Sequence, residues 1–97
     1  MKEHITHLKG KKLASKSSFI NEMKENLQFP ANSGANLDAV WDCMTDLSWL
    51  NAQEIRLVIN GWKGTNKKGG FDYQAFLGEV ETYWNNNPSL NFVIEYA

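Results

Sequence analysis

The order of apolar segments along the chain limits the possible folds more than any other feature. Three short segments containing β-branched residues, at 4–8, 55–59 and 90–96, are predicted to be strands, and stretches with helical signals separate them. Parallel strands need a crossover of roughly a dozen residues or more, usually helical, whereas antiparallel strands can be joined by a tight turn. We therefore expect an α/β fold, with a small three-stranded parallel sheet packed with three to four helices.

Three segments carry the signals of helices. Apolar residues recur at helical spacing from Phe19 until Pro30 ends the pattern, and Ser17 or Ser18 can cap the start. A second helix is predicted from Leu37 to about Leu47, with Asn36 as its N-cap. The strongest amphipathic pattern covers residues 73–84 and is ended by a run of asparagines and a proline.

Composition places the chain among small globular proteins. With 97 residues, 42% of them hydrophobic and 22% charged, residues 1–97 are expected to form a single domain. No apolar run is long enough for a membrane helix or a signal-peptide core, so we expect no membrane partner and a cytoplasmic location. The only cysteine, Cys43, excludes an internal disulfide and is expected to be a small core residue.

The net charge of -1 conceals a separation of charges along the chain. Residues 29–53 contain no Lys or Arg, yet Asp38, Asp42 and Asp46 recur there every four residues. On a helix this spacing places the three carboxylates on the solvent side, with Trp41 and Thr45 at its border. Like charges so arranged cost roughly 0.2–0.5 kcal/mol per pair, which a partner bearing Arg or Lys could offset. Both a recognition surface and an ordinary solvated helix face are compatible with this pattern.

Other functional classes have weaker support. His4 and His7 would point to opposite faces of a strand and have no evident third ligand, so we expect no metal and no cofactor. Asp38 and Asp42 lie on a convex face with no nucleophile nearby, which argues against an enzyme. The alternative is a nucleic-acid-binding module that uses the loop at 62–70, which we expect to be mobile and in which Trp62 could stack on bases beside three lysines.

The residues that decide between these interpretations lie at 36–43. Their sequence, Asn-Leu-Asp-Ala-Val-Trp-Asp-Cys, closely resembles the barstar family, bacterial intracellular inhibitors of the ribonuclease barnase. The likeness extends in the same order over nearly the whole chain, including the helix after Ser17, the strand around Leu57 and the helix from Tyr73. The resemblance implies a three-stranded parallel α/β fold and a protein that blocks a ribonuclease active site without catalysis.

The resemblance also implies a role for individual positions. Asp42 would occupy the phosphate site of the nuclease, and Asp38 would pair with a basic residue at its rim. Gly34 and Asn36 would shape the loop before the helix, with Trp41 and Thr45 packed beside the acids. The implied partner is a cognate RNase toxin bound as a 1:1 heterodimer, with a monomeric free form, no direct contact with nucleic acid, and a biological role as an antitoxin or immunity protein.

The chain departs from the family pattern at a few of these positions. The family's aromatic residue before the glycine corresponds to Asn32, and its Gly-Trp after Thr45 corresponds to Asp46-Leu47, with Trp49 close by. The acid of its C-terminal helix aligns with Thr82, next to Glu81. We therefore expect ten partner-binding residues: Asn32, Gly34, Asn36, Asp38, Trp41, Asp42, Thr45, Asp46, Trp49 and Glu81.

Overall fold

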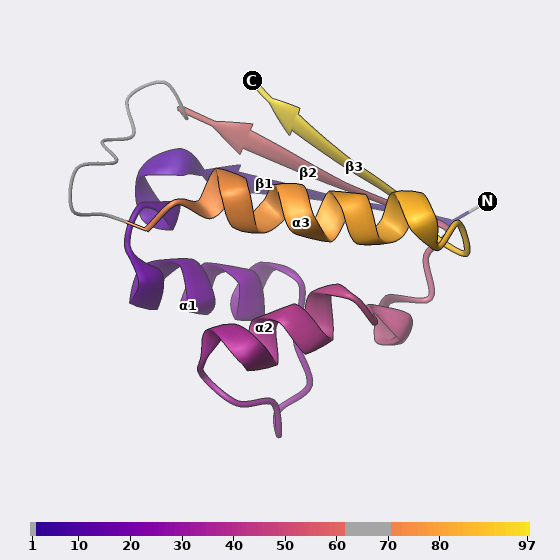
Figure 1. The fold of residues 1–97 in the computed structure, drawn as a ribbon, viewed down its shortest axis with the longest axis horizontal. Coiled ribbons are helices and arrows are strands. Elements are labelled where there is room, and N and C mark those ends of the chain that lie inside the picture. The colour runs from indigo at the N-terminus through magenta and orange to yellow at the C-terminus, as the bar shows by residue number, and fades with distance from the viewer. Residues whose placement is uncertain (1, 62–70) are drawn as a thin grey trace.

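The computed structural model describes residues 2–61 and 71–97 (Figure 1). In chain order its elements are β1 (Glu3–Lys9), the 3-10 turn η1 (Gly10–Leu13), α1 (Lys16–Asn26), α2 (Leu37–Met44), the 3-10 turn η2 (Ser48–Leu50), β2 (Glu54–Asn60), α3 (Tyr73–Asn86) and β3 (Asn91–Tyr96). The strands form one sheet in the order β1-β2-β3, and both neighbouring pairs are parallel. The predicted fold class is therefore confirmed.

The helices cover one face of the sheet. In β1 the side chains of Thr6 and Leu8 are buried, whereas Ile5, pointing the other way, is 49% exposed. Two right-handed crossovers that step in the same direction across a sheet place their helices on the same face, as this burial pattern requires. The uncovered face carries Arg56, which forms ion pairs with Glu54 on its own strand and with Glu95 on β3.

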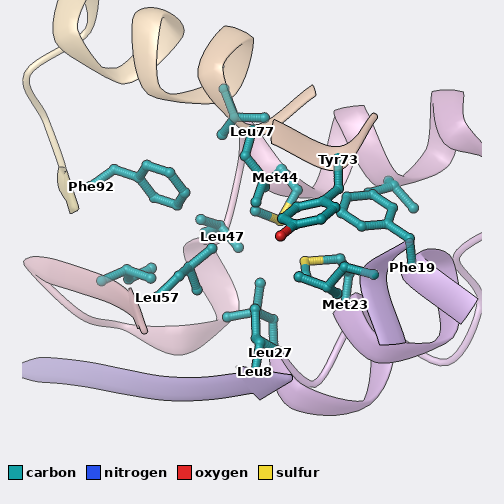
Figure 2. Packing of buried hydrophobic residues seen from close by; sticks show 14 of the residues in the cluster. Leu8, Phe19, Met23, Leu27, Met44, Leu47, Leu57, Tyr73, Leu77 and Phe92 are labelled. Atoms are coloured by element: carbon teal, nitrogen blue, oxygen red, sulfur yellow. The ribbon is translucent and has the colours of Figure 1, made fainter. Parts of the chain in front are cut away.

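The core fills the space between the sheet and the helices. Figure 2 shows Leu57 and Phe92 from the sheet facing Leu77 of α3, with Leu47 near the centre of the cluster. α1 contributes Phe19 and other buried side chains, and α2 contributes Val40 and Met44. Every α-helix thus has an apolar stripe in one continuous core, which fixes how each helix is rotated about its axis.

Two predicted helix ends differ from the structure. Ser15, rather than Ser17 or Ser18, caps α1, and its side chain accepts a hydrogen bond from the Ser18 amide. α2 ends at Met44, three residues before the predicted end, because Leu47 adopts a left-handed conformation (φ 54°) and turns its side chain into the core. The lysine- and glycine-rich segment at 62–70, predicted to be a mobile loop, lies outside the described residues.

Candidate functional site

α2 is the element farthest from the sheet. Figure 1 shows it beyond α1 and α3, with the chain before it forming the tip of the molecule. The indole of Trp41 packs edge-on against two rings of α3, Phe76 and Tyr83, with ring centroids 6.1 and 6.3 Å away. The exposed residues Asp38 and Asp42 lie about 60° and 100° around α2 from Trp41.

The loop before α2 is shaped by short-range contacts. Asn32 is exposed in a turn that the Ser33 amide closes by donating to the Pro30 carbonyl over 3.0 Å. Asn36 caps α2 as predicted, because its Oδ1 accepts from the Ala39 amide at 2.8 Å. A Cβ added at Gly34 would lie 3.3 Å from the Ala39 side chain, so this close approach favours glycine.

Two of the three predicted acids share the exposed side of α2. Asp38 lies in the first turn, where the positive end of the helix dipole stabilises a carboxylate, and Asp42 follows one turn later. Both residues are exposed, and within the described part of the chain neither carboxylate has a hydrogen-bond or ion-pair partner. They are thus available to accept hydrogen bonds from a cationic partner.

The third acid is not part of the helix, contrary to the predicted row of three. Asp46 lies in the turn after Met44, where its Oδ1 accepts from the Ser48 amide at 3.3 Å. Thr45 follows the last residue of α2 as its C-cap, and its hydroxyl donates to the Trp41 carbonyl at 2.8 Å. Asp46 remains exposed beside the end of the helix, but periodicity no longer determines the direction of its side chain.

Trp49 is held by contacts within the protein. Its Nε1 donates to the Leu27 carbonyl at the end of α1 over 2.9 Å, and its ring lies edge-on to Phe29 at 5.7 Å. The residue is only partly buried, so part of its surface still faces solvent. The indole N–H, however, already has an acceptor.

Cys43 lies on α2 between the acids and the core. The sequence predicted a core residue, but the structure shows Cys43 only partly buried and outside the core cluster. Burial, and then the neighbouring charges of Asp42 and Asp46, raise the pKa of its thiol. The thiol is therefore protonated at neutral pH, which does not suit a nucleophile.

On α3 the rings that face α2 identify which side of the helix lies near the acids. Glu79 is three residues after Phe76 and four before Tyr83, so it shares their side, and it is exposed. Glu81 lies about 160° around the helix from Tyr83. Burial raises the pKa of Tyr96 on β3, and the charges of Tyr73, Glu81 and Asp72 add to that shift. The set of residues predicted from the sequence did not include Glu79 or Tyr83, although their spacing from Phe76 was a usable signal that they share its side of α3.

α2 has the expected N-cap and two exposed carboxylates, and the sequence of the chain matches a family model. The model described as "Barstar (barnase inhibitor)" matches residues 3–96. The chain belongs to the barstar family. A Bacillus subtilis (strain 168) protein named "Putative ribonuclease inhibitor YrdF" is 37% identical over 46 residues, which are 47% of this chain and 47% of that protein. The match thus spans about half the length of this curated relative.

Two further features of this barstar-family chain bear on its site. In the described ranges, 2–61 and 71–97, no group of three or more His, Cys, Asp and Glu side chains is arranged to hold a metal ion. None of the helices described there has the length and apolar character needed to cross a bilayer. Asp38 and Asp42 of α2 are exposed carboxylates, which accept hydrogen bonds and carry negative charge.

Proposed function

We propose that this barstar-family protein inhibits a ribonuclease by inserting α2 and the preceding loop into the basic groove that binds RNA. The observation that carries the proposal is the pair Asp38 and Asp42, exposed on one side of α2 and unpaired within the described chain. A nuclease groove is lined by cations that hold phosphates, and a carboxylate is an anionic acceptor that suits the same Arg and Lys side chains. Because a carboxylate offers no bond to hydrolyse, binding blocks the enzyme without turnover.

In this proposal the nine predicted residues between Asn32 and Trp49 each have a physical task. Asp42 takes the place of a phosphate, and Asp38 pairs with a cation at the rim of the groove. Gly34 and Asn36 set the path of the loop, which presents Asn32 at its turn. Trp41, Thr45, Asp46 and the exposed part of Trp49 border these acids.

The size of the surface fits a 1:1 complex. The protein exposes 5667 Å². A standard interface takes ~800 Å² from each partner, about one-seventh of this area. The exposed side of α2 and its loop supply the centre of such a patch, and the adjoining side of α3 enlarges it. We propose a heterodimer with a cognate RNase toxin, in which this chain acts as an antitoxin in the cytoplasm.

An RNA-cleavage assay, titrated with this protein against barnase-type nucleases and any toxin encoded beside it, tests the proposal. The parent protein should abolish cleavage at a stoichiometry of 1:1, and Asp42→Ala should inhibit much more weakly. Glu95→Gln removes the same charge from the uncovered face of the sheet and should inhibit like the parent. Equal inhibition by the parent and Asp42→Ala would remove Asp42 from the site, and absence of inhibition by the parent would contradict the function.

A second pair of variants tests which acid of α3 takes part. Glu79 lies on the side that faces Trp41, whereas the predicted residue Glu81 lies near Tyr96. We propose that Glu79 extends the acidic surface of α2. Glu79→Gln should then weaken inhibition more than Glu81→Gln, and the reverse order would restore the assignment made from the sequence.

A further inference from the structure

Two tryptophan indoles bind main-chain carbonyls at the two ends of the segment that carries the site. Trp49 Nε1 donates to the Leu27 carbonyl, and Trp84 Nε1 donates to the Met44 carbonyl, each over 2.9 Å. The segment between these two acceptors, residues 28–43, contains the loop and nearly all of α2. The hydrogen bonds therefore bracket the surface proposed to enter the nuclease.

Both acceptors are carbonyls that a helix leaves without an internal partner. Leu27 is the C-cap of α1, and Met44 is the last residue of α2. The last four carbonyls of an α-helix have no amide in the next turn, and an indole N–H is a donor that satisfies one of them. The two hydrogen bonds thus hold the C-terminal ends of α1 and α2 in position relative to η2 and α3.

The two indoles are themselves held in place. Trp84 is 7% exposed and lies on the core side of α3, in edge-on contact with Tyr83 at 5.0 Å. Trp49 belongs to η2 and packs against the core cluster, with its ring against Phe29 inside the bracketed segment. One donor therefore ties the end of α2 to α3, and the other ties the turn after α2 back to α1.

We propose that Trp49 and Trp84 are positioning residues, which hold residues 28–43 in the binding conformation before the partner arrives. This inference rests on the proposed function, because it explains how Asp38 and Asp42 are presented. A segment that is ordered in advance loses less conformational entropy on binding, so the affinity is higher for the same contacts. In this role the Trp49 N–H acts within the protein and makes no contact with the nuclease.

The variants Trp49→Phe and Trp84→Phe test this role, since each keeps an aromatic ring and removes the N–H donor. Ile59→Val is the matched control, because it loosens the buried core at β2, outside the bracketed segment. Three quantities are measured for each protein: the free energy of unfolding in urea, amide hydrogen exchange in α2 and in β2, and the dissociation constant for the nuclease.

The Phe variants should show faster hydrogen exchange of the α2 amides than the parent. The exchange rates of the β2 amides should change only by the amount that the change in global stability accounts for. Their dissociation constants should rise by about tenfold, since a more mobile segment must be ordered on binding. Ile59→Val should change exchange in both elements together and leave the dissociation constant near that of the parent.

Two results would overturn the proposal. One is that the α2 amides of both Phe variants exchange at the same rate as those of the parent. The other is a rise in the dissociation constant that stands in the same proportion to the loss of unfolding free energy in the Phe variants as in Ile59→Val. Exchange is measured on the free protein, so a parent that inhibits no nuclease would contradict the proposed function while the exchange result still decides whether the indoles order the segment.

Discussion

The indole Nε1 of Trp84 donates a hydrogen bond to the carbonyl of Met44, 2.9 Å away, and both side chains are buried. The two residues are 40 positions apart and belong to different helices. The end of α2 has no basic residue in its last turn, so its free carbonyl is satisfied by a tertiary contact instead. The position of the acidic helix therefore depends on α3 as much as on its own sequence.

The exposed carboxylates of α2 should make association with a cationic nuclease sensitive to salt. The Debye length falls from ~30 Å at 0.01 M to ~8 Å at 0.15 M ionic strength, so long-range attraction weakens over this range. Asp38→Asn should associate more slowly than the parent at low salt and show a shallower dependence on salt in stopped-flow measurements. Glu95→Gln, on the uncovered sheet face, should change this dependence less. Identical salt dependence for the parent and Asp38→Asn would exclude Asp38 from steering the encounter.

The N-cap of α2 should contribute measurably to stability. Asn36→Ala removes the acceptor of the Ala39 amide and should lower the free energy of unfolding by about 1 kcal/mol in urea titrations. Asn36→Asp keeps an acceptor at the same place and adds a negative charge at the positive end of the helix dipole, so its stability should stay close to that of the parent. Equal losses in both variants would mean that the side chain acts in another way.

The hydroxyl of Tyr73 should lower the stability of the folded protein. Tyr73 is 1% exposed, its hydroxyl has no hydrogen-bond partner among the described residues, and Figure 2 shows it pointing into the apolar cluster. Tyr73→Phe removes the unpaired group and keeps the ring, and should raise the free energy of unfolding by about 1 kcal/mol. Tyr73→Leu, which also loses the ring, should be less stable than the parent. A less stable Tyr73→Phe would show that the hydroxyl makes a favourable contact.

A pair of acids on neighbouring strands should make stability depend on pH. Glu3 and Glu54 are register partners on β1 and β2. The hydrogen bond to Glu54 raises the pKa of Glu3, with desolvation and the charge of Glu54 adding to it. Hydrogen bonds from Glu3 and then Arg56 lower the pKa of Glu54.

The contribution of Glu3 is complete below the unfolded glutamate pKa of ~4.3 and is lost as pH rises through its folded-state pKa. The contribution of Glu54 is present above ~4.3 and is lost as pH falls through its own folded-state pKa. Glu3→Gln supplies an amide donor at every pH. In urea titrations it should therefore gain stability over the parent as pH rises from ~4.3 to neutrality, because Glu3 in the parent loses its proton over this range. A constant difference between the two proteins across this range would contradict the shared hydrogen bond.

Local patterns were enough to predict the helices and strands of this chain and the N-cap and exposed acids of its candidate site. The separation of the strands by helical segments favours parallel pairing through crossovers, and the sheet has this pairing. The N-cap at Asn36 and the shared side of Asp38 and Asp42 followed from spacing within one helix. These features depend on residues a few positions apart, which sequence displays directly.

Features that depend on distant contacts were decided only by the tertiary structure. α2 stops at Met44 because Leu47 turns into a core built by all the elements, which removes Asp46 from the helix. The rings around Trp41 come from α3, and they single out Glu79 as the acid on that side. The N–H groups of Trp49 and Trp84 find their acceptors 22 and 40 residues away. The sequence by itself determined which side chains share a helix or a strand, because periodicity is local. Only packing decided where those elements end and what they face, because burial is shared by the whole chain.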